Sequence, residues 1–111
     1  DLVAGGPLDA GEAADPSCRG YVTEAPDFEL SFEPGALDLF ISVLADADTT
    51  LVINDPSGRW ICDDDGAGSL NPGVHFENPE AGVYDIWVGT YWSGDGQPAR
   101  LGISELGFQE D

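Results

Sequence analysis

The chain has 111 residues, a length that suits one domain with a single modest core. Its composition is 41% hydrophobic and includes three Trp, three Tyr and five Phe, which excludes a disordered acidic tail. The net charge of −19, carried with three Arg and no Lys, disfavours nucleic acids and anionic membranes as partners and favours hard divalent cations and basic proteins.

Residues 1–16 consist mainly of Gly, Ala, Asp and Pro and have no strand or helix periodicity, so we expect a flexible entry segment or linker. A single domain is predicted over residues 17–111. From residue 17 onward, short β-type runs alternate with Gly, Pro, Asn and Asp, and no amphipathic helix is evident. This pattern predicts an all-β domain.

The cleanest strand is predicted over residues 28–33, where Phe28, Leu30 and Phe32 alternate with polar residues. The turn Asp55-Pro56-Ser57-Gly58 predicts one hairpin, and residues 78–82 predict a second. The other predicted strands cover residues 20–23, 37–45, 50–54, 59–63, 73–77, 83–90 and 99–105. About eight strands at this spacing indicate a two-sheet antiparallel β-sandwich of the jelly-roll type.

The two cysteines, Cys18 and Cys62, belong to neither a C-x-x-C pair nor a Cys/His cluster, which argues against zinc. We predict that they form a disulfide, which implies an oxidising, extracytoplasmic compartment (secreted or periplasmic). The alternative is a pair of buried free thiols in a cytosolic protein. No apolar stretch is long enough to span a bilayer, and the start at Asp1 suggests a processed or trimmed chain.

Residues 63–71 (DDDGAGSLN), which we call the acidic loop, are the strongest candidate for a functional site. Calcium takes six to eight oxygen ligands, and clustered Asp with Gly in a loop supplies oxygens and room to bend. The first candidate ligands are Asp63, Asp65 and Asn71, with Asp64 pointing away in an extended segment. Further oxygens are expected from Asp48, Asn54, Asp55 and Asp85 if the fold gathers them.

The acidic loop is not an EF-hand, because Val74 occupies the twelfth position, where a bidentate Glu is required. The competing interpretation is an exposed turn whose carboxylates keep the protein soluble. Catalysis is not expected: the single histidine, His75, should point away from the core face that Val74 and Phe76 define, and no nucleophile or metalloprotease motif occurs.

Aromatic side chains provide a second candidate site. Trp87, Tyr91 and Trp92 lie in or next to one predicted strand, with Trp87 on its outer face, so they are candidates for a platform that stacks against sugar rings. The alternative is core packing, in which Trp87 fills the far side of a covered strand and Trp60 packs near Cys62.

The stretch from Cys18 to Glu105 resembles the bacterial pre-peptidase C-terminal (PPC) domain family, in a cysteine-containing subgroup. The matching segments are residues 48–53 (DTTLVI), 55–58 (DPSG), 63–65 (DDD) and 82–88 (GVYDIWV). The resemblance implies an exported jelly-roll sandwich that serves as a targeting, substrate-binding or secretion-related appendage of a protease. Some members of the family bind calcium, and some bind collagen or polysaccharide.

These observations predict a non-catalytic, secreted or periplasmic calcium-binding β-sandwich module. The alternative function is a carbohydrate-binding module that uses exposed aromatic side chains. The expected partners are calcium and an extracellular protein or polysaccharide, with neither nucleic acid nor membrane insertion.

Overall fold

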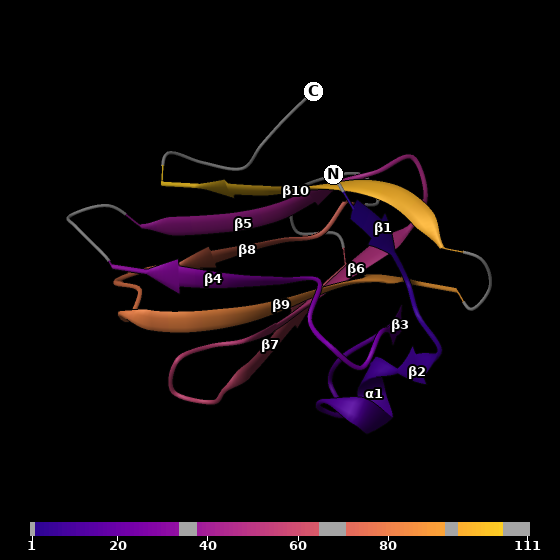
Figure 1. Ribbon diagram of the computed structural model, residues 1–111, viewed down its shortest axis with the longest axis horizontal. Helices are drawn as coiled ribbons and strands as arrows, with labels where there is room; N and C mark the ends of the chain where they lie inside the picture. Colours follow the sequence, from indigo (N-terminus) through magenta and orange to yellow (C-terminus); the bar gives the residue numbers. More distant parts are fainter. Residues whose placement is uncertain (1, 34–37, 65–70, 93–95, 106–111) are drawn as a thin grey trace.

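The computed structural model describes residues 2–33, 38–64, 71–92 and 96–105. Within these residues, ten strands and one single-turn helix form two antiparallel sheets (Figure 1). The elements are β1 (Leu2–Ala4), β2 (Leu8–Asp9), α1 (Ala10–Ala13), β3 (Tyr21–Val22), β4 (Phe28–Phe32), β5 (Leu39–Leu44), β6 (Thr49–Asn54), β7 (Trp60–Asp63), β8 (Gly73–Phe76), β9 (Gly82–Thr90) and β10 (Gln97–Ser104).

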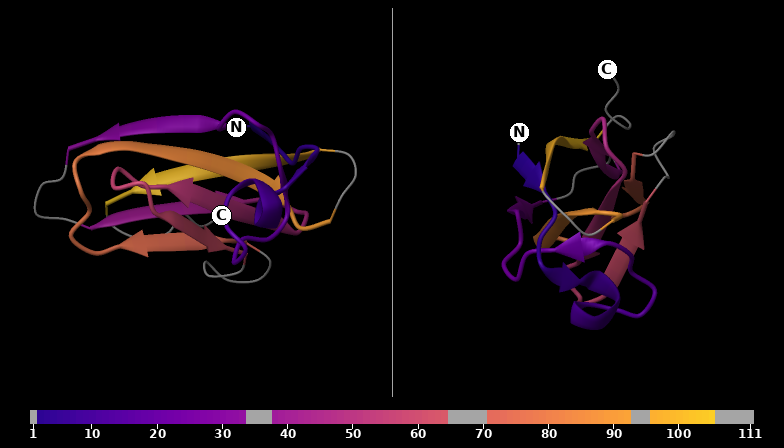
Figure 2. Two further views of the ribbon diagram at one scale, coloured as in Figure 1. Left: turned by 90° about the horizontal axis from the view of Figure 1, so that it is seen from below. Right: turned by 90° about the vertical axis from the view of Figure 1, so that its right-hand side faces the viewer.

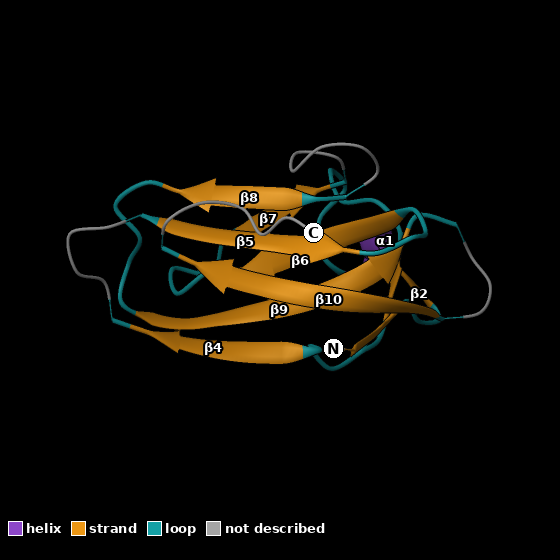
Figure 3. Ribbon diagram, turned by 90° about the horizontal axis from the view of Figure 1, so that it is seen from above, coloured by secondary structure: helices purple, strands orange, loops and turns teal. Residues whose placement is uncertain are grey.

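The smaller sheet has the strand order β1-β10-β5-β8, and the larger has the order β2-β3-β9-β6-β7, with β4 also paired to β9. Seen from above, β8, β5 and β10 lie in front of the larger sheet (Figure 3). The end-on view shows the two layers, with α1 outside the larger sheet (Figure 2). The predicted two-sheet antiparallel β-sandwich is therefore confirmed, with two more strands than expected.

The main core lies between the two sheets and is built by strand alternation. Leu39, Ile41 and Val43 of β5 point inward from the smaller sheet, and Ile86 and Val88 of β9 point inward from the larger one, all fully buried. Tyr84 completes this layer, because its ring packs edge-on against those of Phe32 and Phe76. One row of alternating residues on β5 and one on β9 thus face the main core, as the sequence predicts.

The eight predicted strands are all present, and β6 and β7 form the first predicted hairpin, from Leu51↔Asp63 to Asn54↔Trp60. Gly58 has the expected positive φ, +88°. The second predicted hairpin is wrong, because β8 pairs with β5 whereas β9 pairs with β6 and β4. The connection after Phe76 carries the chain from one sheet to the other, and Phe76 then faces Tyr84 across the core with ring centroids 5.3 Å apart.

The prediction of a flexible linker over residues 1–16 needs correction. Strand β1 pairs with β10 in the smaller sheet, and β2 pairs with β3 in the larger sheet. Ala4 and Ala10 are fully buried. The N-terminal segment is therefore packed into the fold and contributes a strand to each sheet. Strands of two or three residues are too short to show alternation, and small side chains pack closely without the apolar pattern that sequence inspection uses.

A second, smaller cluster covers the outer face of the larger sheet and consists of Ala10, Cys18, Val22 and Val52. The predicted disulfide between Cys18 and Cys62 is present, with its Cα atoms 5.3 Å apart. It ties the N-terminal segment to β7 directly over this cluster. The cluster explains why β6 is buried on both faces, since Val52 points outward and is still only 1% exposed.

Asp27 fills a break in the pairing beside β9, between β3 and β4. Its backbone N–H donates to the Ile86 carbonyl (2.8 Å), and its Oδ2 accepts from the Val88 N–H (2.7 Å). Burial raises the pKa of Asp27 above its usual value, against the smaller lowering effect of the Val88 hydrogen bond. The fold therefore favours the neutral form of this side chain.

We expect Asp27→Asn to raise the free energy of unfolding at neutral pH by up to about 1 kcal/mol, because the amide oxygen still accepts from Val88 and no charge is buried. Asp27→Ala should lower it by about 1–2 kcal/mol by leaving the Val88 N–H without its acceptor. Urea unfolding measures both. Since its pKa is higher in the folded than in the unfolded chain, Asp27 destabilises the fold only where it is charged, so the difference in stability between wild type and the Asn variant should vanish as the pH falls below the unfolded-state pKa. A difference that is constant with pH would contradict this assignment.

Candidate functional site

One end of the sandwich brings together the N-terminal segment, the acidic loop and the end of β9. Two hollows lie there and share Arg19. The first, which we call the acidic recess, has a volume of about 220 Å³ and is lined by Ser17, Arg19, Cys62, Asp63 and Asp64. The second, which we call the aromatic cleft, has a volume of about 470 Å³ and is lined by Asp9, Gly11, Pro16, Cys18, Arg19, Gly20, Tyr21, Tyr91 and Trp92.

The two described ends of the acidic loop are anchored by their side chains. Asp63 Oδ2 accepts from the Gly73 N–H (2.9 Å), which links the end of β7 to the start of β8. Asn71 Oδ1 accepts from the Ala45 N–H (3.1 Å), which holds the loop against the connection between β5 and β6. Asp65 and residues 66–70 lie outside the described residues. Asp63, Asp64 and Asn71 therefore lie at the same end of the sandwich as Asp46 and Asp48.

The other predicted ligands are divided between the two ends of β6. Asp48 precedes this strand, and its carbonyl accepts from the Tyr91 N–H (3.0 Å) at the acidic-loop end. Asn54 ends the strand and Asp55 follows it at the far end, about 17 Å away for six residues in extended conformation. Asp85 pairs with Asn54 across the sheet. In the part of the chain that the structure describes, no group of three His, Cys, Asp or Glu side chains is arranged to hold a metal ion.

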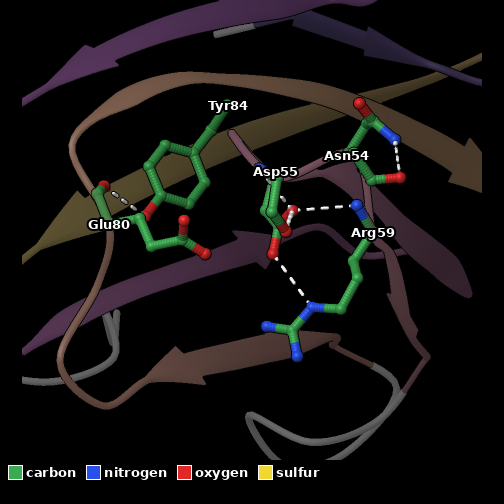
Figure 4. A network of polar contacts seen from close by, with 7 residues as sticks. Asn54, Asp55, Arg59, Glu80 and Tyr84 are labelled. Atoms are coloured by element: carbon green, nitrogen blue, oxygen red, sulfur yellow. Dashed lines mark hydrogen bonds and ion pairs between the residues drawn. The ribbon is translucent and has the colours of Figure 1, made fainter.

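Asp55 is buried and organises the turn between β6 and β7 (Figure 4). Its Oδ1 accepts from the Ser57 N–H, the Ser57 hydroxyl and the Arg59 N–H at 2.7–3.0 Å, and its Oδ2 accepts from Arg59 Nε at 3.2 Å. Burial alone would raise the pKa of Asp55, but these hydrogen bonds outweigh it and lower the pKa below its usual value. We assign Asp55 a structural role in the turn.

Tyr84 lies beside this turn and shares its polar surroundings. Its hydroxyl donates to the Glu80 carbonyl (2.8 Å), as Figure 4 shows. Burial, followed by the nearby carboxylates of Asp55 and Glu80, raises the pKa of Tyr84 above its usual value. The hydroxyl therefore stays neutral and acts as a donor across the physiological pH range.

The three aromatic residues predicted as a sugar platform are separated by the structure. Trp87 packs beside Trp60, with ring centroids 5.4 Å apart, against the small cluster over the larger sheet. Tyr91 and Trp92 follow the end of β9, just beyond Thr90, the residue that pairs with Tyr21 of β3. The expected core-packing alternative therefore describes Trp87 and Trp60, whereas Tyr91 and Trp92 line the aromatic cleft.

Sequence inspection did not single out Asp9, Arg19 and Tyr21 as lining residues of the cleft. Asp9 and Tyr21 are neighbours because β2 pairs with β3, and no local signal predicts that pairing. His75 is exposed and points away from the core, as predicted. Its ring stacks on Phe40 at 4.2 Å, and its Nε2 lies 2.8 Å from Asp38 Oδ2.

The two antiparallel sheets and the Cys18–Cys62 disulfide together define the class of the protein, a disulfide-bonded β-sandwich. The chain is 35% identical over 108 residues to an uncharacterized protein of Synechococcus elongatus, and the match covers 94% of this chain and 75% of that protein. The chain belongs to the same family as that protein. No family model and no solved structure matches the chain. The described residues contain no helix long and apolar enough to cross a membrane.

Proposed function

We propose that the chain is a non-catalytic, extracytoplasmic accessory module of the PPC type that binds calcium at the acidic loop. The Cys18–Cys62 disulfide supports an oxidising compartment. The β-sandwich and the ordered Asp55-Pro56-Ser57-Gly58 turn agree with the architecture that the resemblance implies. Attachment to a protease is part of the same proposal.

The observation that carries the calcium proposal is the anchoring of both loop ends. The hydrogen bonds of Asp63 to Gly73 and of Asn71 to Ala45 hold two oxygen-bearing side chains at one end of the sandwich. A carboxylate or amide oxygen that accepts one N–H bond retains a lone pair for a cation. The net charge of −19 also favours a bound divalent cation, which relieves repulsion among the carboxylates.

Thermal or urea unfolding with calcium and with chelator tests this proposal. An ion that binds only the native state raises the free energy of unfolding by about 2.7 kcal/mol at 100 times its dissociation constant. We therefore expect an unfolding midpoint that rises with calcium concentration and falls back with EDTA. Equal midpoints under the two conditions would rule out calcium binding by the native state.

Asp63→Asn provides the site-specific test, because its amide oxygen still accepts from the Gly73 N–H while one carboxylate charge is lost. We expect this variant to lose most of the calcium-dependent increase. Glu29→Gln is the matched control, since it removes the same charge from an exposed position on β4, far from the acidic loop. If both variants reduced the increase equally, the effect would come from net charge and not from a site.

A further inference from the structure

The aromatic cleft is walled by rings from two distant parts of the chain. Tyr21 comes from β3, and Tyr91 and Trp92 directly follow β9. Trp92 is 71% exposed, the largest value among the exposed large hydrophobic residues. Its ring meets the ring of Tyr91 edge-on at a centroid distance of 4.9 Å and an interplanar angle of 78°. The Tyr91 ring thus packs against the Trp92 ring, and most of the Trp92 side chain remains exposed and accessible to a ligand.

The rim of the cleft offers one acceptor and one donor. Asp9 uses Oδ1 to accept from the Gly11 N–H (2.8 Å), and its Oδ2 accepts no hydrogen bond from the described residues. Arg19 is exposed and makes no ion pair with any residue in the described ranges. A carboxylate and a guanidinium at the edge of an aromatic wall can bind the hydroxyl groups of a ligand whose apolar face stacks on a ring.

The cleft is built before any ligand arrives. The Cys18–Cys62 disulfide fixes the segment that carries Arg19, and Tyr21 pairs with Thr90 of β9. Gly20 has a φ of +93°, and a Cβ at this position would lie 2.4 Å from Thr50 Oγ1. Only glycine therefore lets the segment lie this close to the sheet at the point where Gly20 lines the cleft. A ligand would need to order little of the protein.

The charge of the protein and of the cleft favours an uncharged ligand. A net charge of −19 repels anions, and Arg19 at the rim of the cleft offsets the charge of Asp9, so this cleft gives a small cation little net attraction. A volume of about 470 Å³ lies within the range of small-molecule sites, about 300–1,000 Å³. An uncharged ligand ring with one apolar face can stack on the aromatic side chains of the cleft. Its hydroxyl groups can accept hydrogen bonds from Arg19 and donate them to Asp9.

We infer that the aromatic cleft binds a neutral saccharide, with a pyranose ring stacked on Trp92 and its hydroxyl groups hydrogen-bonded to Asp9 and Arg19. This site is separate from the calcium ligands proposed at the acidic loop and does not depend on them. Trp87 has no part in it.

Titration of the full chain with cellohexaose, xylohexaose, mannohexaose, laminarihexaose and N-acetylchitohexaose tests the inference by calorimetry and by the NMR signal of the Trp92 indole N–H. We expect at least one hexasaccharide to bind and to shift that signal, in EDTA as in calcium. Trp92→Ala should weaken binding about tenfold or more, which corresponds to the loss of one stacked aromatic contact. Arg19→Met should also weaken it without a change in the unfolding midpoint.

Phe28→Ala is the matched control, because Phe28 is an aromatic residue that is 44% exposed on β4, away from the cleft. It should leave the affinity within about twofold of wild type. The inference is overturned if none of the five sugars binds, if Trp92→Ala binds as tightly as wild type, or if choline shifts the Trp92 signal and the sugars do not. Sugar binding that persists in EDTA would show that this site does not need calcium, so the result is independent of whether the calcium proposal holds.

Discussion

Replacing both Cys18 and Cys62 with alanine is expected to lower the free energy of unfolding by about 4 kcal/mol in the chain-entropy model. The disulfide closes a loop with a sequence separation of 44, so its loss greatly increases the freedom of the unfolded chain. The unfolding midpoint should fall by about 15–25 °C for a domain of this size. Calorimetry or circular dichroism of the double variant measures this loss.

The same substitution should release the N-terminal segment before the rest of the sandwich unfolds. Cys18 belongs to the small cluster with Ala10, Val22 and Val52, which holds α1 on the larger sheet. Amide exchange should therefore increase first in residues 8–22, whereas β5 and β9 stay protected. Wild type in reductant is the control and should behave like the double variant. Equal midpoints for oxidised and reduced protein would contradict the stabilising role assigned to the disulfide.

Asp55→Ala is expected to lower the free energy of unfolding by about 2–3 kcal/mol. The change removes the acceptor of three hydrogen bonds to Oδ1 and of the Arg59 contact to Oδ2. The Ser57 and Arg59 N–H groups lose their partner within a turn that also depends on the Gly58 N–H bond to the Asp55 carbonyl. Urea unfolding at neutral pH measures the loss.

The pH dependence of Asp55→Asn tests the electrostatic part of this assignment. Because the hydrogen bonds lower the pKa of Asp55 in the folded state, its charged form stabilises the fold above the unfolded-state pKa of about 4. This contribution is lost as the pH falls through the folded-state value. Wild type should therefore exceed the Asn variant in stability at neutral pH, and the difference should shrink below about pH 4. A difference that is independent of pH would show that Asp55 stabilises the turn by shape alone.

The strands of this protein were predictable because their signal is local. Alternation of Tyr84, Ile86 and Val88 with polar or half-exposed neighbours identifies the inner face of β9, and burial confirms it. The Asp-Pro-Ser-Gly turn was equally clear, since Pro presets one corner and Gly58 supplies the positive φ. The disulfide was predictable because only two cysteines exist. Each of these features depends on composition or on residues a few positions apart.

The candidate sites were only partly predictable from the sequence, because they depend on contacts between residues far apart in the chain. The acidic loop is a sequence feature, but the anchoring of Asn71 to Ala45 joins residues 26 positions apart. Asp55 was a candidate calcium ligand like Asp63. The fold instead places Asp55 at the far end of β6, where its carboxylate accepts hydrogen bonds within the turn that follows the strand. Trp87 and Trp92 likewise lie five positions apart and serve different surfaces, because Trp87 lies within β9 and packs beside Trp60, whereas Trp92 follows the strand and lines the aromatic cleft.

By itself, the sequence determined the all-β class, the positions of eight strands, the first hairpin and the acidic character of one loop, because short-range alternation and turn chemistry carry that information. Only the tertiary structure decided which sheet each strand joins and that residues 2–14 belong to the sandwich. It also decided that Asp9, Arg19 and Trp92 share one cleft. These features arise from pairing and packing between residues far apart in the chain, which no local pattern records.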